Sequence, residues 1–167
     1  MSIASTLVAD LEAEAKLTRT MLAVVPEDRF PWKPHEKSMS LGQLASHLAE
    51  TPAWTGSMLE PAMDFAAMGD YRPFLARSRG ELLATFEANH AAAAGALRGR
   101  DDRAMNEAWT MKNGPTVLLT QPRKDALRCI LVHHAVHHRG QLSVYLRLLG
   151  VPLPPLYGPT ADHPAFA

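Results

Sequence analysis

Four of the eight histidines lie close together, in the run VHHAVHHRGQL from residue 132 to residue 142. His134 and His138 are four residues apart, and on a helix this spacing places two side chains on one face, one turn apart. Two imidazoles so arranged can bind the same metal ion. His133 and His137 form a second pair, rotated about 100° around the helix. The run predicts two ligands of a metal site, and a usual catalytic site needs a third.

The residues around this run predict a helix over residues 124–149. Apolar residues such as Leu131 and Leu142 recur at spacings of three and four, on the same stripe as His134 and His138. This stripe predicts that both imidazoles point into the core. The alternative interpretation is that they are core residues whose ring nitrogens are satisfied by hydrogen bonds within the protein.

Three further helices are expected, over residues 2–25, 40–58 and 78–97. Capping boxes are predicted at Ser40–Gln43 and Ser78–Glu81, and Pro52 predicts a kink in the second helix. Between residues 101 and 121, two short strands are expected at 109–111 and 116–119, around an Asn-Gly turn. Residues 60–76 are expected to be irregular, and residues 151–167 to form an extended tail. The predicted fold class is all-α, a four-helix bundle with long connecting loops.

In the second helix, His47 falls on the inward stripe and is the natural third metal ligand. Glu50 lies three residues later and could reach the same cavity as a catalytic proton carrier, or could be a solvated helix glutamate. Gln141, on the stripe of His138, could orient a ligand or hold a histidine. His90 on the third helix also faces inward but is not needed as a ligand. Arg139 could hold a substrate carboxylate, but a surface position is expected.

Composition predicts a soluble, globular single domain over residues 1–167. Of the 167 residues, 47% are hydrophobic and 20% are charged, and 17 basic residues balance 17 acidic ones. A net charge of zero disfavours nucleic acid as a partner and permits self-association. Cys129 is the only cysteine, so no disulfide can form within the chain; it is expected near the core.

No membrane partner is expected, because no apolar run approaches the roughly 20 residues of a membrane span. The N-terminal residues also lack the basic-then-apolar pattern of a secretory signal. A cytoplasmic location is therefore the prediction.

Five sequence patches resemble the DinB/YfiT-like family, the damage-inducible type of metal-dependent proteins. They are WKP (32–34), KSMSLGQLASH (37–47), HAVHHRGQL (134–142), GVP (150–152) and YGPTAD (157–162), in the family's order. The resemblance implies a four-helix bundle and a histidine triad at His47, His134 and His138 that binds a divalent ion, commonly zinc or nickel. It also implies a homodimer, which the alanine-rich tract at 91–96 would permit.

Characterised relatives include transferases and isomerases that use low-molecular-weight thiols such as bacillithiol, mycothiol or glutathione. The resemblance therefore implies a metal-dependent enzyme, a thiol-dependent transferase or a hydrolase, with an open coordination position and a small-molecule substrate. Two alternatives stay open. The protein could bind metal without turnover, as a stress or interaction protein, or it could be a purely structural bundle with core histidines.

Overall fold

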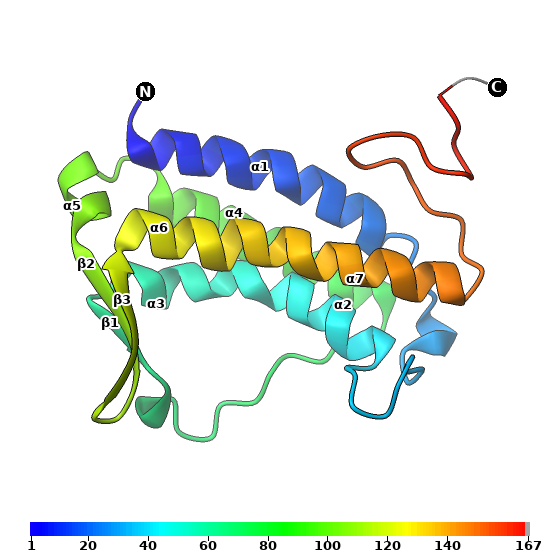
Figure 1. The fold of residues 1–167 in the computed structure, drawn as a ribbon, viewed down its shortest axis with the longest axis horizontal. Helices are drawn as coiled ribbons and strands as arrows, with labels where there is room; N and C mark the ends of the chain where they lie inside the picture. The colour runs from blue at the N-terminus through cyan, green and yellow to red at the C-terminus, as the bar shows by residue number, and fades with distance from the viewer. Residues whose placement is uncertain (166–167) are drawn as a thin grey trace.

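The computed structural model describes residues 1–165, in which four long helices lie side by side with a small sheet at one end (Figure 1). The long helices are α1 (Ile3–Leu22), α2 (Leu41–Glu50), α4 (Arg79–Leu97) and α7 (His134–Leu148). The packed neighbours are α1 and α4, α4 and α2, α2 and α7, and α7 and α1, so the four helices close a bundle. Residues 166 and 167 of the predicted domain and tail lie outside the described residues.

Short elements connect the long helices. They are η1 (Glu27–Arg29), η2 (Thr51–Trp54), α3 (Thr55–Leu59), η3 (Phe65–Ala67), α5 (Asp102–Asn106), α6 (Arg123–Leu127) and η4 (Arg128–His133). The last of these, η4, is a π-helical turn that joins α6 directly to α7. Within residues 1–165, none of the helices is both long and apolar enough to span a lipid bilayer.

The predicted helix signals act where they were expected. At the start of α2, the Ser40 hydroxyl accepts a hydrogen bond from the backbone N–H of Gln43 (3.1 Å). In return, the side-chain oxygen of Gln43 accepts from the backbone N–H of Ser40 (2.8 Å). The second capping box is half formed, because the Glu81 carboxylate accepts from the Arg77 N–H instead. Pro52 lies in η2, a 3₁₀ turn that divides the predicted second helix into α2 and α3.

The small sheet corrects the predicted all-α class. Its strands are β1 (Ala62–Asp64), β2 (Ala108–Asn113) and β3 (Thr116–Pro122), with β2 in the middle. The β2–β3 hairpin was predicted. In contrast, β1 lies in the segment that was expected to be irregular, and it pairs parallel to β2. Asp64 holds this pairing, because its carboxylate accepts from the Gly114 N–H (2.9 Å) and lies 3.3 Å from the Lys112 ammonium.

The buried apolar residues form two clusters along the bundle. One lies near the sheet and includes Trp109, which is fully buried; the other fills the far end, between α2, α4 and α7. At that end Gly150, in the left-handed conformation (φ 72°), terminates α7, and the Val151 N–H donates to the Leu146 carbonyl (3.0 Å). The histidines of α2 and α7 lie between these two ends.

Candidate metal centre

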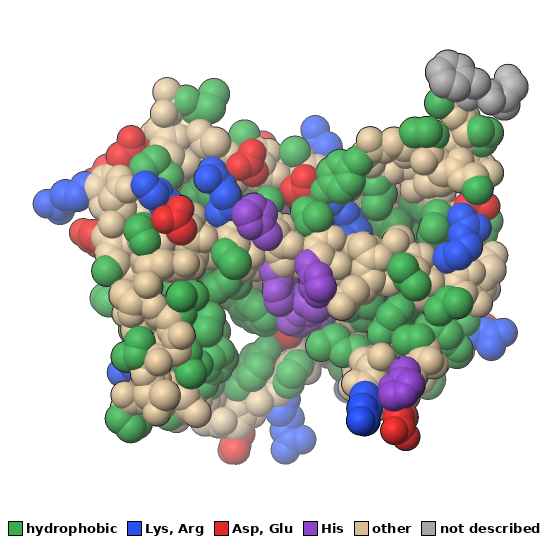
Figure 2. All heavy atoms as spheres, in the orientation of Figure 1, with side chains coloured by type: hydrophobic (Ala, Val, Ile, Leu, Met, Phe, Trp, Pro, Cys, Tyr) green, Lys and Arg blue, Asp and Glu red, His purple; other side chains and the backbone are tan. Residues whose placement is uncertain are grey.

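Three predicted ligands converge at the middle of the bundle. His47 comes from α2, and His134 and His138 come from the first two turns of α7; we call them the three-histidine site. One ring nitrogen from each lies within 4.8 Å of the other two, and the Nε2 atoms of His47 and His134 are 2.8 Å apart. Figure 2 shows histidine side chains grouped in the middle of one face, beside a hollow lined by hydrophobic side chains.

These separations suit a single ion. Zinc binds imidazole nitrogen at about 2.0–2.1 Å, so a tetrahedral ion holds its ligand nitrogens ~3.3 Å apart. The 2.8 Å between the Nε2 atoms of His47 and His134 is somewhat below this value, so a bound ion would move these two rings slightly apart. The three rings are steeply inclined to one another, at 68° to 88°. The rings therefore pack edge to face and do not stack.

The protein environment keeps these histidines neutral. Burial is the main cause that lowers the pKa of His47, His134 and His138, and the proximity of neighbouring imidazoles lowers the pKa of each further. For His138 the hydrogen bond with Gln141 acts in the opposite direction and raises the pKa, but the net shift is still downward. For His134 the pKa falls to about 4. Trp54 contributes to this burial, since its ring lies 5.3 Å from the ring of His47 and 5.8 Å from that of His134. Near pH 7 the lone pairs are free, which metal binding requires.

Gln141 fixes the orientation of His138. Its side-chain oxygen lies 2.7 Å from the Nδ1 atom of His138. Because a carboxamide oxygen only accepts hydrogen bonds, the Nδ1 atom carries the proton, and the lone pair of Nε2 is left available for a metal ion. Gln141 is exposed on α7. Of the two roles expected for Gln141, the geometry favours the one that holds a histidine.

Glu50 lies one turn after His47 and is buried, with 9% of its surface exposed. Its Oε1 atom accepts from the Tyr71 hydroxyl (2.6 Å) and from the Phe74 N–H (3.2 Å). Its Oε2 atom is buried and has no hydrogen-bond partner within residues 1–165. Glu50 and His47 line the same cavity of about 410 Å³. The interpretation of Glu50 as a solvated helix glutamate is therefore wrong.

The π-helical turn η4 immediately precedes His134. Such turns are rare and occur frequently at functional sites, because the extra residue shifts the side chains that follow. In this chain the turn leads directly into the first turn of α7, which carries His134 and packs against α2. A donor set of three neutral imidazoles from two packed helices fits a divalent ion of the zinc or nickel type.

The family model for the DinB family matches residues 1–165. The chain belongs to the DinB family. Among solved structures, a DinB-like protein (YjoA) from Bacillus subtilis is 18% identical, with 91% of this chain and 97% of that chain covered and a TM-score of 0.68. A DinB-like protein from Bacillus cereus is 19% identical, with 90% and 95% covered and a TM-score of 0.68.

YfiT from Bacillus subtilis, described as a probable metal-dependent hydrolase with an unusual four-helix bundle topology, is also similar. It is 16% identical, with 89% of this chain and 88% of that chain covered and a TM-score of 0.66. At these identities the likeness establishes the DinB-like fold. A search of curated proteins gave no match.

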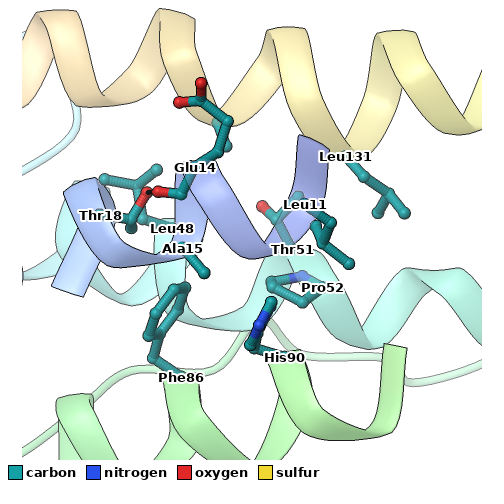
Figure 3. Close-up of a pocket in the computed structure, with 11 residues that line it drawn as sticks. Leu11, Glu14, Ala15, Thr18, Leu48, Thr51, Pro52, Phe86, His90 and Leu131 are labelled. Carbon is teal, nitrogen blue, oxygen red and sulfur yellow. Dashed lines mark hydrogen bonds between the residues drawn. The ribbon is translucent and has the colours of Figure 1, made fainter. Parts of the chain in front are cut away.

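The other candidate residues of this DinB-family chain lie outside the three-histidine site. His133 and His137 are exposed, although the ring of His137 packs 4.9 Å from that of His138. His90 stacks on Phe86 in α4 and lines a small cavity beside α1, α2 and η2 (Figure 3). That cavity of about 20 Å³ has room for about one water molecule, so it is no substrate site.

Two predictions about α7 and the turn before it are corrected. Arg139 was expected at the surface, but it is 1% exposed and forms an ion pair with Glu14 of α1. It also donates to the hydroxyls of Thr18 and Tyr157, so it faces away from the histidines and is not free to hold a substrate. Cys129 was expected near the core but is exposed.

Sequence reasoning missed Tyr71 as the partner of Glu50. Tyr71 lies in the irregular segment after η3, where no periodicity relates it to α2. Trp54 did carry a signal, because it falls on the same predicted helix face as His47. Its role as a cover over two imidazoles required the position of α7 as well.

Proposed function

We propose that this protein is a divalent-metal-dependent enzyme of the hydrolase type, with His47, His134 and His138 as the metal ligands. The observation that carries the proposal is the convergence of three ring nitrogens within 4.8 Å of one another. The description of the structurally similar YfiT as a probable metal-dependent hydrolase supports it. Zinc and nickel are the ions that we expect, because imidazole is a preferred ligand of both.

A divalent ion in a site of three neutral ligands keeps its full charge, and it supplies Lewis acidity and lowers the pKa of coordinated water toward about 7. The side chains around the site would orient the ligands and limit the access of water. Gln141 orients His138, and Trp54 keeps bulk water away from His47 and His134.

We propose Glu50 as the proton carrier. Tyr71 and Phe74 donate to its Oε1 atom and so fix the carboxylate, and Glu50 lines the cavity shared with His47, where the carboxylate would take a proton from a bound nucleophile. A positioned general base contributes about 10²–10⁴-fold to rate.

The test is turnover of a panel of esters and amides by the zinc-loaded and nickel-loaded protein. Glu50→Gln keeps the shape of the side chain but removes the base, so we expect kcat to fall by about 10²–10⁴-fold with unchanged metal content. The control is Glu60→Gln, an exposed glutamate that follows α3 and should leave kcat unchanged. Full activity of Glu50→Gln would contradict the role of Glu50.

Thiol-dependent transfer is the second reaction to test, because the same base could take the proton of an S–H group. The panel therefore includes low-molecular-weight thiols paired with electrophiles. Turnover only with a thiol would replace hydrolysis by transfer. Absence of turnover with either set, in protein that holds metal, would favour a binding protein without catalysis.

A further inference from the structure

We propose that the substrate is neutral or cationic and carries an apolar aryl or alkyl group, which binds in a methionine-lined cavity beside His134. This inference rests on the proposed function, since it names the class of substrate for the same site. The cavity holds about 260 Å³, close to the ~300–1,000 Å³ of typical small-molecule pockets.

The sheet builds one wall of this cavity. Met63 of β1 and Met111 of β2 are direct partners in the parallel register, so their side chains lie side by side. Phe65 and Met68, which follow β1, add to the apolar wall. Met63 and Trp109 also belong to the buried apolar cluster near the sheet, so the sheet contributes to the core as well as to this cavity. The placement of Met63 and Met111 brings β1 and β2 into a wall of the cavity that His134 also lines.

Trp54, Tyr71 and His134 also line this methionine-lined cavity. Trp54 and Tyr71 line the cavity of about 410 Å³ that contains His47 and Glu50 as well. The two cavities are therefore neighbours that share these two aromatic rings, and each is lined by a histidine of the three-histidine site. A substrate whose apolar group lies among the methionines would have its reactive group at the metal ligands.

The charges around both cavities select against anions. Within residues 1–165, neither cavity is lined by a lysine or an arginine, and the Glu50 carboxylate lies in one of them. An anionic group would lose its hydration without gaining a counter-charge and would be repelled by Glu50. Arg139 cannot serve as the counter-charge for an anion, because it is buried in an ion pair with Glu14 of α1. A neutral or cationic group meets no such penalty.

A cavity wall made of methionines also predicts that the cavity accepts apolar ligands of different shapes. The side chain is unbranched, flexible and polarizable, so it adapts to apolar ligands of different outline and packs well against aromatic rings. We therefore expect the pocket to discriminate by charge more strongly than by exact shape.

The test compares three probes that share one apolar body: 4-phenyl-1-butanol, 4-phenylbutylammonium and 4-phenylbutyrate. Binding is followed by NMR of methionine methyl groups, first in the metal-free protein and then in the zinc-loaded protein. In the metal-free protein we expect the alcohol and the ammonium to saturate the signals of Met63 and Met111, and the carboxylate to bind at least 10-fold more weakly. Equal or tighter binding of the carboxylate there would overturn the proposal.

Met111→Gln places a polar group in the wall and should weaken binding of the alcohol by at least about 5-fold. The matched control is Val117→Gln, on the exposed part of β3 in the same sheet, which should have no effect. Met68→Gln, outside the strands, provides the same test if Met111→Gln unfolds. Unchanged binding in a folded Met68→Gln or Met111→Gln variant would contradict the proposal.

The metal-free measurement separates this inference from the proposed function. If the probes do not bind, the proposed apolar substrate pocket is contradicted, while the results on metal content and turnover still stand. Loss of metal binding or turnover, with the probes bound as expected, would overturn the proposed function and leave the pocket.

Discussion

At the scale of single residues, the hydrogen bond between Gln141 and His138 determines which ring nitrogen faces the other two imidazoles. Partners of this kind raise ligand basicity and restrict ring rotation, and their loss typically costs 10–100-fold in metal affinity. The bond requires only an acceptor at position 141. The geometry of the site therefore depends in part on the exposed side chain of Gln141.

Gln141→Ala should weaken zinc binding by about 10–100-fold, because His138 loses the acceptor that fixes its tautomer. Gln141→Glu retains the acceptor and should restore the affinity. Competition with a chelating dye measures both, and Ser143→Ala on the same helix serves as a control. Equal affinity of wild-type and Gln141→Ala protein would show that the bond has no part in the site.

Each of the three histidines could be placed on the inward face of its helix from the sequence, because helical spacing is a local property. The two interactions that fix Glu50 and Arg139 are not local: Tyr71 lies 21 residues from Glu50, and Glu14 lies 125 residues from Arg139. A charged residue beside an inward stripe is normally exposed. Only a partner from another helix reverses that expectation for Arg139.

At the scale of elements, Arg139 joins three parts of the chain. It pairs with Glu14, donates to the Glu14 carbonyl (3.0 Å) and Thr18 (2.9 Å) of α1, and binds the Tyr157 hydroxyl of the tail. Its cation also lies 5.2 Å from the centre of the Tyr157 ring. This contact fixes α7 against α1 on the side opposite to the histidines.

Arg139→Ala should lower the free energy of unfolding by about 3 kcal/mol, because it leaves the half-buried Glu14 carboxylate and several acceptors without a partner. The matched control is Arg19→Ala, which breaks an ion pair with Glu87 that is exposed on both sides and should cost at most about 1 kcal/mol. Urea denaturation compares them. Similar losses for the two variants would contradict a structural role of Arg139.

Helices and turns that are marked by residues close together in the sequence could be predicted, whereas elements that depend on distant residues were missed. Ser40 and Pro52 act within a few residues, so the start and the break of the second helix could be inferred. Strand β1 has only three residues, and its pairing is not local, because Ala62 lies opposite Thr110 of β2, 48 residues later in the sequence. The π-helical turn before His134 likewise left no pattern in the periodicity.

At the scale of the whole molecule, the buried histidines make stability depend on pH. The folded state lowers their pKa below the unfolded value of about 6.5, to about 4 for His134. Between these values the unfolded chain binds more protons than the folded one, so stability falls as pH drops. The contribution is complete above about pH 6.5 and is lost progressively toward pH 4.

We expect the metal-free protein to unfold at a lower temperature at pH 5 than at pH 7.5. Because the groups are only half-buried, a loss of about 1 kcal/mol is expected, or roughly 2–4 °C in Tm for a chain of this size. His134→Gln removes one lowered pKa and should flatten the dependence. A Tm at pH 5 that equals or exceeds the Tm at pH 7.5 would contradict the prediction that acid destabilises the folded protein.

The central claim is that His47, His134 and His138 bind one divalent ion, and metal content tests it most directly. After loading with zinc and removal of excess, elemental analysis should give one ion per chain. Alanine variants of each of the three should retain little or none, while His133→Ala at the end of η4 and His137→Ala in α7 should retain it fully. Stoichiometric zinc in the His47→Ala and His138→Ala proteins would contradict the account.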